Sequence, residues 1–449
     1  MRYLPLSTDD RAEMLGKIGV GDINDLFADV PPHALLKELV DLPLHMTEME
    51  VEKNFNAFAA KNVAAGSVPF FVGAGAYKHH VPSSVDYQIQ RGEYLTAYTP
   101  YQPEISQGTL QTLYEFQTQV AQITGMDVAN ASMYDGSTGC GEAALMARRV
   151  TKKKKILLSG NLHPHYIDVV KSATKYTDDV VITNDPTVNN TESLLDQVDA
   201  ETSCVIVQNP DFFGNLNDYT EFAAALQEQK ILLIIVTTEI VALGAIKSPG
   251  EMGADIVVGE GQSIGNGLNY GGPYVGLFAT RQKYVRQMPG RLCGETKDAD
   301  GTRGYVLTLS TREQHIRREK ATSNICTNAG LCTLAFTIHM TLLGEKGFRQ
   351  LAKINHAGAV KLRNKLQNVN GLTFLNKTFF NEFTVRLNKD AAEVVEALVE
   401  HDVIAGVPAS RLYPDNDELK NDLIIAVTET TSEEDMEVLV AELQEVLNA

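Results

Sequence analysis

Short, mostly apolar runs alternate with amphipathic stretches through the middle of the chain. The apolar runs are rich in β-branched residues and cover positions 155–159, 180–183, 204–208, 231–237 and 255–258. Helical patterns such as 165–176 and 218–229 separate them, and Asn217 is the predicted N-cap of the second. Apolar strands separated by helices are typical of a parallel sheet that is buried on both faces. The pattern therefore predicts an α/β fold.

The pattern changes after Val258. A glycine-rich loop, GEGQSIGNGLNYGGP (259–273), leads into another apolar run at 274–279 and leaves no room for a crossover helix. A parallel neighbour needs such a crossover, whereas an antiparallel strand does not. We therefore expect one antiparallel strand in a mixed, mainly parallel sheet.

Both ends of the chain differ from this middle part. Helical patterns at 9–18 and 109–124 precede the sheet, and 327–343 predicts one long helix that ends at Gly344. The last hundred residues predict a small α+β unit, with strands at 372–375, 382–387 and 423–428 and helices at 391–400 and 433–447. A capping box of Thr431 and Glu434 is predicted to open the final helix. We expect a helical N-terminal arm (1–65), a large domain (66–340) and a small C-terminal domain (341–449).

Charge and composition narrow the possible functions. The formal net charge is −18, from 39 Lys and Arg against 57 Asp and Glu in 449 residues. Affinity for nucleic acid comes mostly from Lys and Arg that neutralise phosphates, so this balance argues against such a partner. No run approaches the ~18 consecutive apolar residues of a membrane span. Asp9 and Asp10 stand where an export signal would be apolar, and five scattered cysteines contain no CxxC pair, so we expect a cytoplasmic protein with buried thiols.

Two loops carry candidate chemistry. The tract YDGSTGCGEAALMA (134–147) runs from small residues into a helix, where Gly136, Ser137 and Thr138 offer backbone and hydroxyl donors to an anion. A glycine-rich turn that only lets the helix pack on the sheet explains the same residues. The tract YTPYQPEISQG (98–108) combines stiffening prolines with tyrosines and polar groups, which suits a recognition loop but also an ordinary exposed loop.

A basic cluster stands out in this acidic chain. Arg312, Arg317, Arg318 and Lys320 fall within nine residues, and such a group binds phosphates, carboxylates or an acidic protein. A solvated helix face is the alternative. The histidine pairs 79–80 and 163/165 lack further ligands at familiar spacing, so no metal site is expected, and no nucleotide-binding motif is present.

Six long tracts, spread over nearly the whole chain, carry a resemblance to a known family. They are YLPLSTDDRAEMLGKIGVGDINDLFADVP, FVGAGAYKHHVPSSVD, RGEYLTAYTPYQPEISQGTLQTLYEFQ, GMDVANASMYDGSTGCGEA, GADIVVGEGQSIGNGLNYGGPYVGLFAT and REQHIRREKATSNICTNAG. In these tracts the chain resembles the glycine dehydrogenase (decarboxylating) family, the P-proteins of the glycine cleavage system, in its alpha-subunit (subunit 1) form. The resemblance implies a fold-type I pyridoxal phosphate (PLP) architecture. It also implies an enzyme that decarboxylates glycine on PLP, which serves as the electron sink, and passes the aminomethyl group to lipoylated H-protein.

The chain departs from the residues that a PLP site requires. In this fold the Schiff-base lysine follows the strand that reads DIVVGEGQSIGNG, yet residues 255–270 contain no lysine, and Gln262 and Ser263 stand nearby. Where an aspartate should pair with the pyridine nitrogen, the preceding strand offers Thr237, Thr238 and Glu239. The resemblance then implies that a homologous beta subunit carries the lysine in an alpha2beta2 assembly.

On this interpretation the alpha chain keeps the fold and contributes groups to the partner's active site at the interface. The residues expected there are Tyr98, Tyr101, Gln102, Glu104, Ser323, Asn324 and Thr327. Gly136, Ser137 and Thr138 remain as a pseudo-site for the cofactor, and the arginines near Arg317 are expected to help dock the acidic H-protein. Two alternatives remain: a self-sufficient PLP enzyme that uses an atypical lysine such as Lys247, and a non-catalytic scaffold subunit.

Overall fold

The computed structural model describes residues 6–36, 38, 40–312 and 314–449, without the side chains of residues 311 and 315. The chain divides into two compact units, Met1–Val63 and Ala64–Ala449. The first unit contains α1 (Thr8–Ile18), η1 (Ile23–Phe27) and α2 (Glu48–Ala59). Each opens with a capping box, but none of the described residues in these three helices is buried. Local capping therefore defines these helices, while their apolar side chains face solvent.

A seven-stranded sheet forms the centre of the second unit, with the strand order β1-β7-β6-β5-β4-β2-β3. The strands are β1 (Val128–Ala129), β2 (Lys155–Leu158), β3 (Val180–Thr183), β4 (Thr202–Gln208), β5 (Leu232–Thr237), β6 (Ile256–Glu260) and β7 (Gly276–Thr280). Strands β2 to β6 pair in parallel, and β7 returns antiparallel to β6, with Val258 opposite Phe278. The predicted mixed, mainly parallel sheet with an antiparallel return is confirmed.

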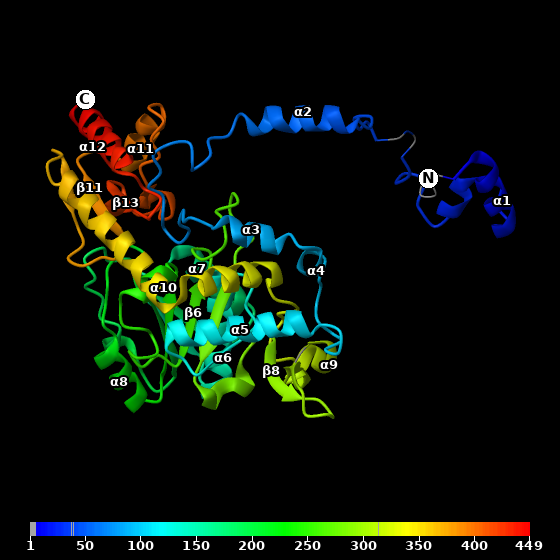
Figure 1. Cartoon of the computed structure of the whole chain (residues 1–449), viewed down its shortest axis with the longest axis horizontal. Helices are drawn as coiled ribbons and strands as arrows, with labels where there is room; N and C mark the ends of the chain where they lie inside the picture. Colours follow the sequence, from blue (N-terminus) through cyan, green and yellow to red (C-terminus); the bar gives the residue numbers. More distant parts are fainter. Residues whose placement is uncertain (1–5, 37, 39, 313) are drawn as a thin grey trace. The chain divides into compact units, whose positions relative to one another are not determined.

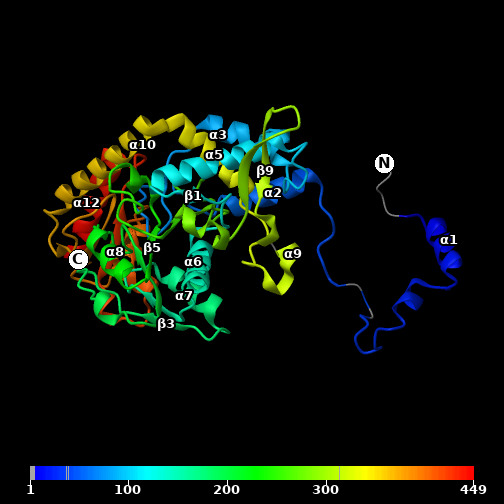
Figure 2. The same ribbon diagram turned by 90° about the horizontal axis from the view of Figure 1, so that it is seen from below.

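Helices cover both faces of this sheet. In Figure 2, α5 (Gln107–Thr124) and α10 (Gly330–Leu366) lie on one side of it, and α6 (Gly136–Thr151) and α7 (Pro164–Thr174) lie on the other. Side chains alternate along β4, so Val205 packs with the first pair of helices and Ile206 with the second. Burial on both faces explains why the central strands are mostly apolar.

A second, antiparallel sheet lies in the C-terminal part, in the order β10-β11-β13-β12. Its strands are β10 (Leu372–Phe374), β11 (Glu382–Leu387), β12 (Val407–Pro408) and β13 (Asp422–Ala426). The second half of α10 packs on it together with α11 (Ala391–Val399) and α12 (Glu433–Asn448) (Figure 1). Residues 70 and 71 also join this sheet. Phe71 N donates to Ile404 O, and the Phe71 carbonyl accepts from Ala426 N.

Shorter elements connect these layers. They are α3 (Ser83–Ile89), α4 (Gly92–Leu95), η2 (Leu195–Gln197), α8 (Thr220–Glu228), η3 (Ile240–Gly244), η4 (Gln282–Gln287), β8 (Leu292–Lys297), β9 (Arg303–Thr308), η5 (Ser310–Arg312), α9 (Gln314–Arg317), η6 (Arg318–Lys320), η7 (Ala409–Arg411) and η8 (Asp417–Leu419). Within the described residues, none of the helices combines the length and apolar content needed to cross a membrane.

Two local predictions were wrong. Helix α8 begins at Thr220, and the side chain of Asp218, not that of Asn217, accepts from its first backbone N–H. The last helix is capped one residue later than predicted, by Ser432 with Asp435. Gly344 has non-helical dihedral angles (φ 57°, ψ −176°), so the first helical stretch of α10 ends there, as predicted. A second helical stretch, which the sequence pattern did not predict, follows it directly to Leu366. Glycine permits this kink because it tolerates a positive φ.

Candidate functional site

Polar side chains from distant parts of the chain are buried together where β5 and β6 end. Glu239 follows β5, Glu260 ends β6, and Gln262 lies two residues beyond it; all three are buried. The carboxyl ends of parallel strands are where α/β folds place their functional groups. We call residues 73–80, which run past these side chains, the 73–80 segment.

Gln262 binds the backbone of the 73–80 segment. Its Oε1 accepts from Tyr77 N at 2.9 Å, and its Nε2 donates to Tyr77 O at 2.9 Å and to Asn266 O at 3.0 Å. The amide thus satisfies both backbone groups of one residue, as a neighbouring strand would. Gln262, which stands in the loop where the resemblance places a Schiff-base lysine, serves here as a fixed structural contact.

His79 lies between two carboxylates. Its Nε2 is 2.9 Å from Glu239 Oε2, and its Nδ1 is 2.8 Å from Glu429 Oε2. Burial alone would lower the pKa of His79, but the two carboxylates, Glu239 foremost, outweigh it and raise the pKa to about 10. Burial likewise opposes the charge on Glu429, yet its hydrogen bond to His79 brings its pKa down to about 2. His79 and Glu429 therefore form an ion pair at neutral pH, and Glu239 contacts the other nitrogen of the ring.

Glu382 of β11 connects the same segment to the small sheet. Its Oε1 accepts from Ala74 N at 2.6 Å, and its Oε2 accepts from Tyr77 OH at 2.9 Å. Burial raises the pKa of Glu382 to about 7, despite these two donors. The 73–80 segment is therefore bound on one side by the large sheet and on the other by the small sheet.

The predicted anion loop is satisfied by carboxyl groups of the chain itself. Asp135 is the N-cap of α6, and it accepts from Thr138 N at 2.8 Å and from the Ser137 hydroxyl at 2.5 Å. Gly136 N donates to Glu260 Oε2 at 2.9 Å. Burial raises the pKa of Glu260 to about 8, against the backbone N–H groups that favour its charged form. No group of three or more His, Cys, Asp and Glu side chains in the described part of the chain is arranged to hold a metal ion.

The predicted interface residues of the 98–108 tract lie at the surface. Tyr98 and Tyr101 are 77% and 61% exposed, and Gln102 and Glu104 are exposed as well. The Arg291 guanidinium lies 5.6 Å from the centre of the Tyr101 ring. These side chains extend from the connection between α4 and α5, and they are available to another chain.

The second predicted group lies beside the first. Thr327 N donates to Tyr134 OH at 3.4 Å, Ser323 Oγ accepts from Ile325 N at 3.0 Å, and Asn324 is exposed. A cavity of about 80 Å³ is lined by Tyr98 together with Asn328 and Gly330, among other residues. Tyr98 is the one predicted interface residue in this lining, so the structure places the start of the 98–108 tract next to the residues that follow Thr327.

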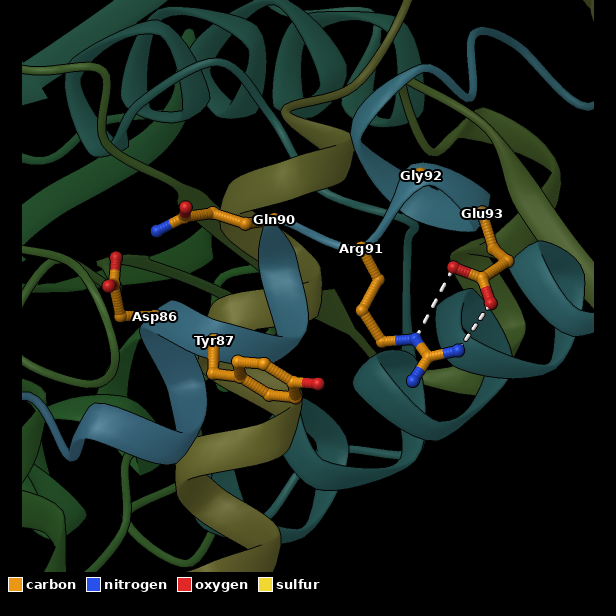
Figure 3. A pocket seen from close by; sticks show the side chains of 6 residues that line it. All are labelled: Asp86, Tyr87, Gln90, Arg91, Gly92 and Glu93. Atoms are coloured by element: carbon orange, nitrogen blue, oxygen red, sulfur yellow. Dashed lines mark hydrogen bonds and ion pairs between the residues drawn. The ribbon is translucent and has the colours of Figure 1, made fainter.

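A surface hollow of about 460 Å³ lies next to the same region, along α3 and α4. Figure 3 shows its lining, with the Tyr87 ring on one side and the ion pair of Arg91 and Glu93 on the other. The Arg91 Nη2 to Glu93 Oε1 distance is 2.5 Å, and both side chains are at least half exposed. Nothing in the sequence pattern indicated this hollow, because its groups become neighbours only through the turn between the two short helices.

The other candidates have local roles. Arg312 donates to the backbone carbonyls of Met288, Leu309 and Gly290, whereas Arg318 and Lys320 are exposed. Lys247, the alternative Schiff-base lysine, is partly exposed and donates to the Thr220 hydroxyl at 2.5 Å, in a different place from Gln262.

The sequence did not reveal the roles of Tyr77, His79, Glu382 and Glu429. Their partners are 160 to 350 positions away, so no local spacing brings them together. The sequence does contain one indication of this contact. The two glycines in FVGAGAYKHH are typical of a place where the backbone passes close to another part of the chain.

Comparisons with known proteins agree over the whole chain. The family model of the glycine cleavage system P-protein matches residues 1–443. A relative from Parvibaculum lavamentivorans, named probable glycine dehydrogenase (decarboxylating) subunit 1, is 63% identical over 448 residues and covers 100% of both chains. A crystal structure of glycine decarboxylase (P-protein) of the glycine cleavage system, in inhibitor-bound form, is 41% identical, covers 100% of both chains and has a TM-score of 0.89.

More distant structures share only the fold. A C-DES mutant with glycine covalently linked to its PLP cofactor is 14% identical, with a TM-score of 0.62 over 85% of this chain and 97% of that one. The fold is that of the fold-type I PLP-dependent enzymes, as expected.

Proposed function

The chain belongs to the glycine cleavage system P-protein family, as a glycine dehydrogenase (decarboxylating) subunit 1, and we propose that it is one half of a two-subunit enzyme. The other half is a homologous beta subunit that holds PLP. The assembled enzyme decarboxylates glycine and transfers the aminomethyl group to the lipoyl group of H-protein. The name "subunit 1" of the relative supports a partner, and an alpha2beta2 assembly follows from the family resemblance.

The residues of this chain do not fit PLP. A lysine is needed for the resting linkage, yet residues 255–270 contain none, and Gln262 is engaged with Tyr77. The acid at the end of β5, Glu239, is engaged with His79. The backbone N–H of Gly136, at the start of α6, already has a carboxyl partner. We therefore place the cofactor in the partner subunit and derive no reaction step in this chain.

The main support for the role of this chain in the partner's site is the exposed surface of the 98–108 tract. Tyr98, Tyr101 and Ile105 are each more than 60% exposed, although aromatic and aliphatic groups of this size are normally covered. The prolines at 100 and 103 stiffen the tract, so its side chains are held in position before a partner binds. We propose that this surface completes the partner's active site by binding and orienting the substrate there.

The N-terminal unit supports an obligate partner as well. Met49, Phe55 and Phe58 of α2 are each 60% exposed or more, and the two phenylalanine rings form an edge-to-face pair with centres 6.1 Å apart. Within the described residues of the N-terminal unit, nothing covers the apolar face of α2, and such a face is typical of an interface. We propose that the unit formed by residues up to Val63 contacts the partner subunit.

We propose a docking surface for H-protein on this chain from the charge of its exposed side chains alone. Arg318 and Lys320 are exposed in a chain whose net charge is −18, so they form a local positive surface for an acidic carrier. Arg312 is engaged with backbone carbonyls and contributes to the local fold instead.

The test uses the purified chain, alone and assembled with the beta subunit. The chain alone is expected to show neither glycine decarboxylation nor the visible absorbance of lysine-bound PLP; full activity of the lone chain would refute the proposal. In the assembled enzyme, Tyr98→Phe, Tyr101→Phe or Glu104→Gln is expected to lower the rate tenfold or more. This corresponds to about 1.4 kcal/mol of transition-state stabilisation.

Matched controls separate the alternatives. Tyr176→Phe changes a tyrosine that is 91% exposed beyond the end of α7, and it is expected to leave the rate unchanged. If all three site variants behave like this control while assembly persists, the chain is a scaffold. If borohydride reduction attaches pyridoxyl to Lys247, the self-sufficient enzyme is the correct interpretation.

A further inference from the structure

Side chains of the chain itself fill three places where the resemblance puts groups that bind PLP. In the loop where the lysine is expected, Gln262 is bound to the 73–80 segment. The position of the pyridine-pairing acid carries Glu239, which is also bound to that segment through His79. The start of α6 holds the carboxyl group of Glu260. A cofactor would have to displace all of these contacts at once.

The amide at position 262 matches the segment chemically. Tyr77 has one backbone donor and one backbone acceptor. The glutamine side chain pairs with both, because its oxygen accepts from Tyr77 N and its NH2 group donates to Tyr77 O. A lysine has only donors, so it would leave Tyr77 N unpaired in a buried place. Position 262 therefore carries the residue type that holds the segment.

Glu260 satisfies a set of donors that a ligand would otherwise use. Its Oε2 accepts from Gly136 N at 2.9 Å, and its Oε1 accepts from Gln262 N and Val275 N, both at 3.1 Å. A helix N-terminus with converging N–H groups is a typical anion site. Here the acceptor is part of the chain and is buried.

The 73–80 segment is packed too tightly to share its place with a ring. A Cβ on Gly73 would stand 2.1 Å from Glu382 Oε1. Gly75 has a φ of +100°, and a Cβ there would stand 3.0 Å from the His163 ring. The His163 Nε2 is in turn 2.9 Å from Ala74 O. Only glycine allows the backbone to pass here, which accounts for the GAG sequence.

We propose that the 73–80 segment and Glu260 form an internal ligand that fills the cofactor position of this chain and excludes both PLP and free phosphate from it. The same contacts join the large and small sheets without a cofactor. This inference rests on the proposed function, in which the partner subunit carries PLP, and deepens it by naming the groups that close this chain's own site.

The first test measures binding to the lone wild-type chain. We expect 1 mM PLP or 10 mM inorganic phosphate to leave its melting temperature within about 1 °C, because a ligand stabilises only a state that it binds. Hydrogen exchange of peptides covering residues 73–80 is expected to be slow and unchanged by PLP. A rise of several degrees together with faster exchange in this segment would mean that PLP displaces it, and the inference would be wrong.

The second test places a lysine in the loop where the resemblance expects one. Gln262→Lys is expected to yield no borohydride-reducible pyridoxyl group at position 262, because the segment still fills the site. Lys247→Arg in the same background removes the other candidate lysine and serves as the control for surface labelling. Stoichiometric labelling at position 262 would overturn the inference. Wild-type exchange data remain decisive if this variant does not fold.

The third test weakens the internal ligand. Glu260→Gln replaces one acceptor oxygen by an NH2 group, so at least one backbone N–H loses its partner. Amides at the start of α6, residues 136–139, are expected to exchange about tenfold faster. Glu228→Gln, on the exposed end of α8, is the matched control and is expected to change nothing. Equal exchange in both variants would contradict the assigned role of Glu260.

The outcomes distinguish this inference from the proposed function. A lone chain that binds PLP but shows no activity would refute the internal ligand alone, because a silent cofactor does not prevent the 98–108 tract from serving the partner. A lone chain that decarboxylates glycine would refute the proposed function.

Discussion

Replacing His79 by glutamine is expected to destabilise the lone chain by about 3–5 kcal/mol, the usual cost of removing one partner from a buried ion pair. The ring is almost fully buried, and both of its nitrogens contact carboxylates at 2.8–2.9 Å. A pKa raised from 6.5 to about 10 corresponds to roughly 5 kcal/mol of preference for the protonated ring, at 1.36 kcal/mol per pKa unit. The typical cost of breaking a buried ion pair and the raised pKa of His79 therefore give the same order of magnitude for the loss of stability.

The effect of His79→Gln should depend on pH in a defined way. Because the folded pKa of His79 is raised, its contribution is fully present below 6.5 and is lost as the pH rises toward 10. The folded pKa of Glu429 is lowered to about 2, so its contribution is present above 4.5 and is lost as the pH falls toward 2. The difference in unfolding free energy between wild type and variant should therefore be largest between about pH 4.5 and 6.5.

Urea unfolding followed by circular dichroism, at pH 5.5, 7.5 and 9.5, measures this difference. His401→Gln is the matched control, because His401 also pairs with a glutamate but is exposed, and it is expected to have little effect. A His79→Gln variant within about 1 kcal/mol of wild type at pH 5.5 would refute the reasoning. So would a difference that grows steadily toward pH 9.5.

Three further outcomes follow from the same structure. Burial raises the pKa of Glu260 to about 8, so its contribution to stability falls as the pH rises from about 4.5 to 8, and Glu260→Gln should remove that slope in urea unfolding. Phe55→Ser or Phe58→Ser should weaken assembly with the beta subunit about tenfold or more, as measured by sedimentation. Covering a phenylalanine side chain contributes about 1.5–3 kcal/mol to the binding free energy, and both rings are exposed in the lone chain. The melting temperature of the lone chain should therefore stay unchanged. Lys247→Arg should keep full activity in the assembled enzyme; a loss would support a catalytic role for that lysine.

Much of the fold was predictable because each local pattern has a single structural solution. The run 204–207 is apolar at every step, and a strand with Val205 on one face and Ile206 on the other has to be covered on both sides. The glycine-rich loop after Val258 is too short for a crossover, so an antiparallel return was the remaining choice. Cap residues were less predictable, since Asn217 and Asp218 are both good acceptors and only the backbone geometry decides between them.

The buried cluster was not predictable from spacing. His79 and His80 are adjacent, yet one contacts Glu239 and Glu429 through its ring, and the other donates its backbone N–H to Glu429. Hydrophobic periodicity says which face is buried but not which charged groups meet between two sheets. The absence of a lysine at residues 255–270 was visible in the sequence, whereas the role of Gln262 required the position of Tyr77.

If the partner subunit carries the cofactor, as proposed, this chain still needs the whole fold, because the surface proposed to serve the partner is built from segments that only the fold brings together. The 98–108 tract continues into α5, which is tied to α10 by Gln119 Nε2 donating to Thr341 Oγ1 at 2.9 Å. The residues before α10 are held by Tyr134, whose hydroxyl accepts from Cys326 N at 2.9 Å, and Tyr134 directly precedes the α6 cap. The order of α6 depends in turn on Glu260, and that of Glu260 on β6. Disturbing Glu260 or the 73–80 segment should therefore alter the surface of the 98–108 tract as well, although the coupling runs through α6 and Tyr134.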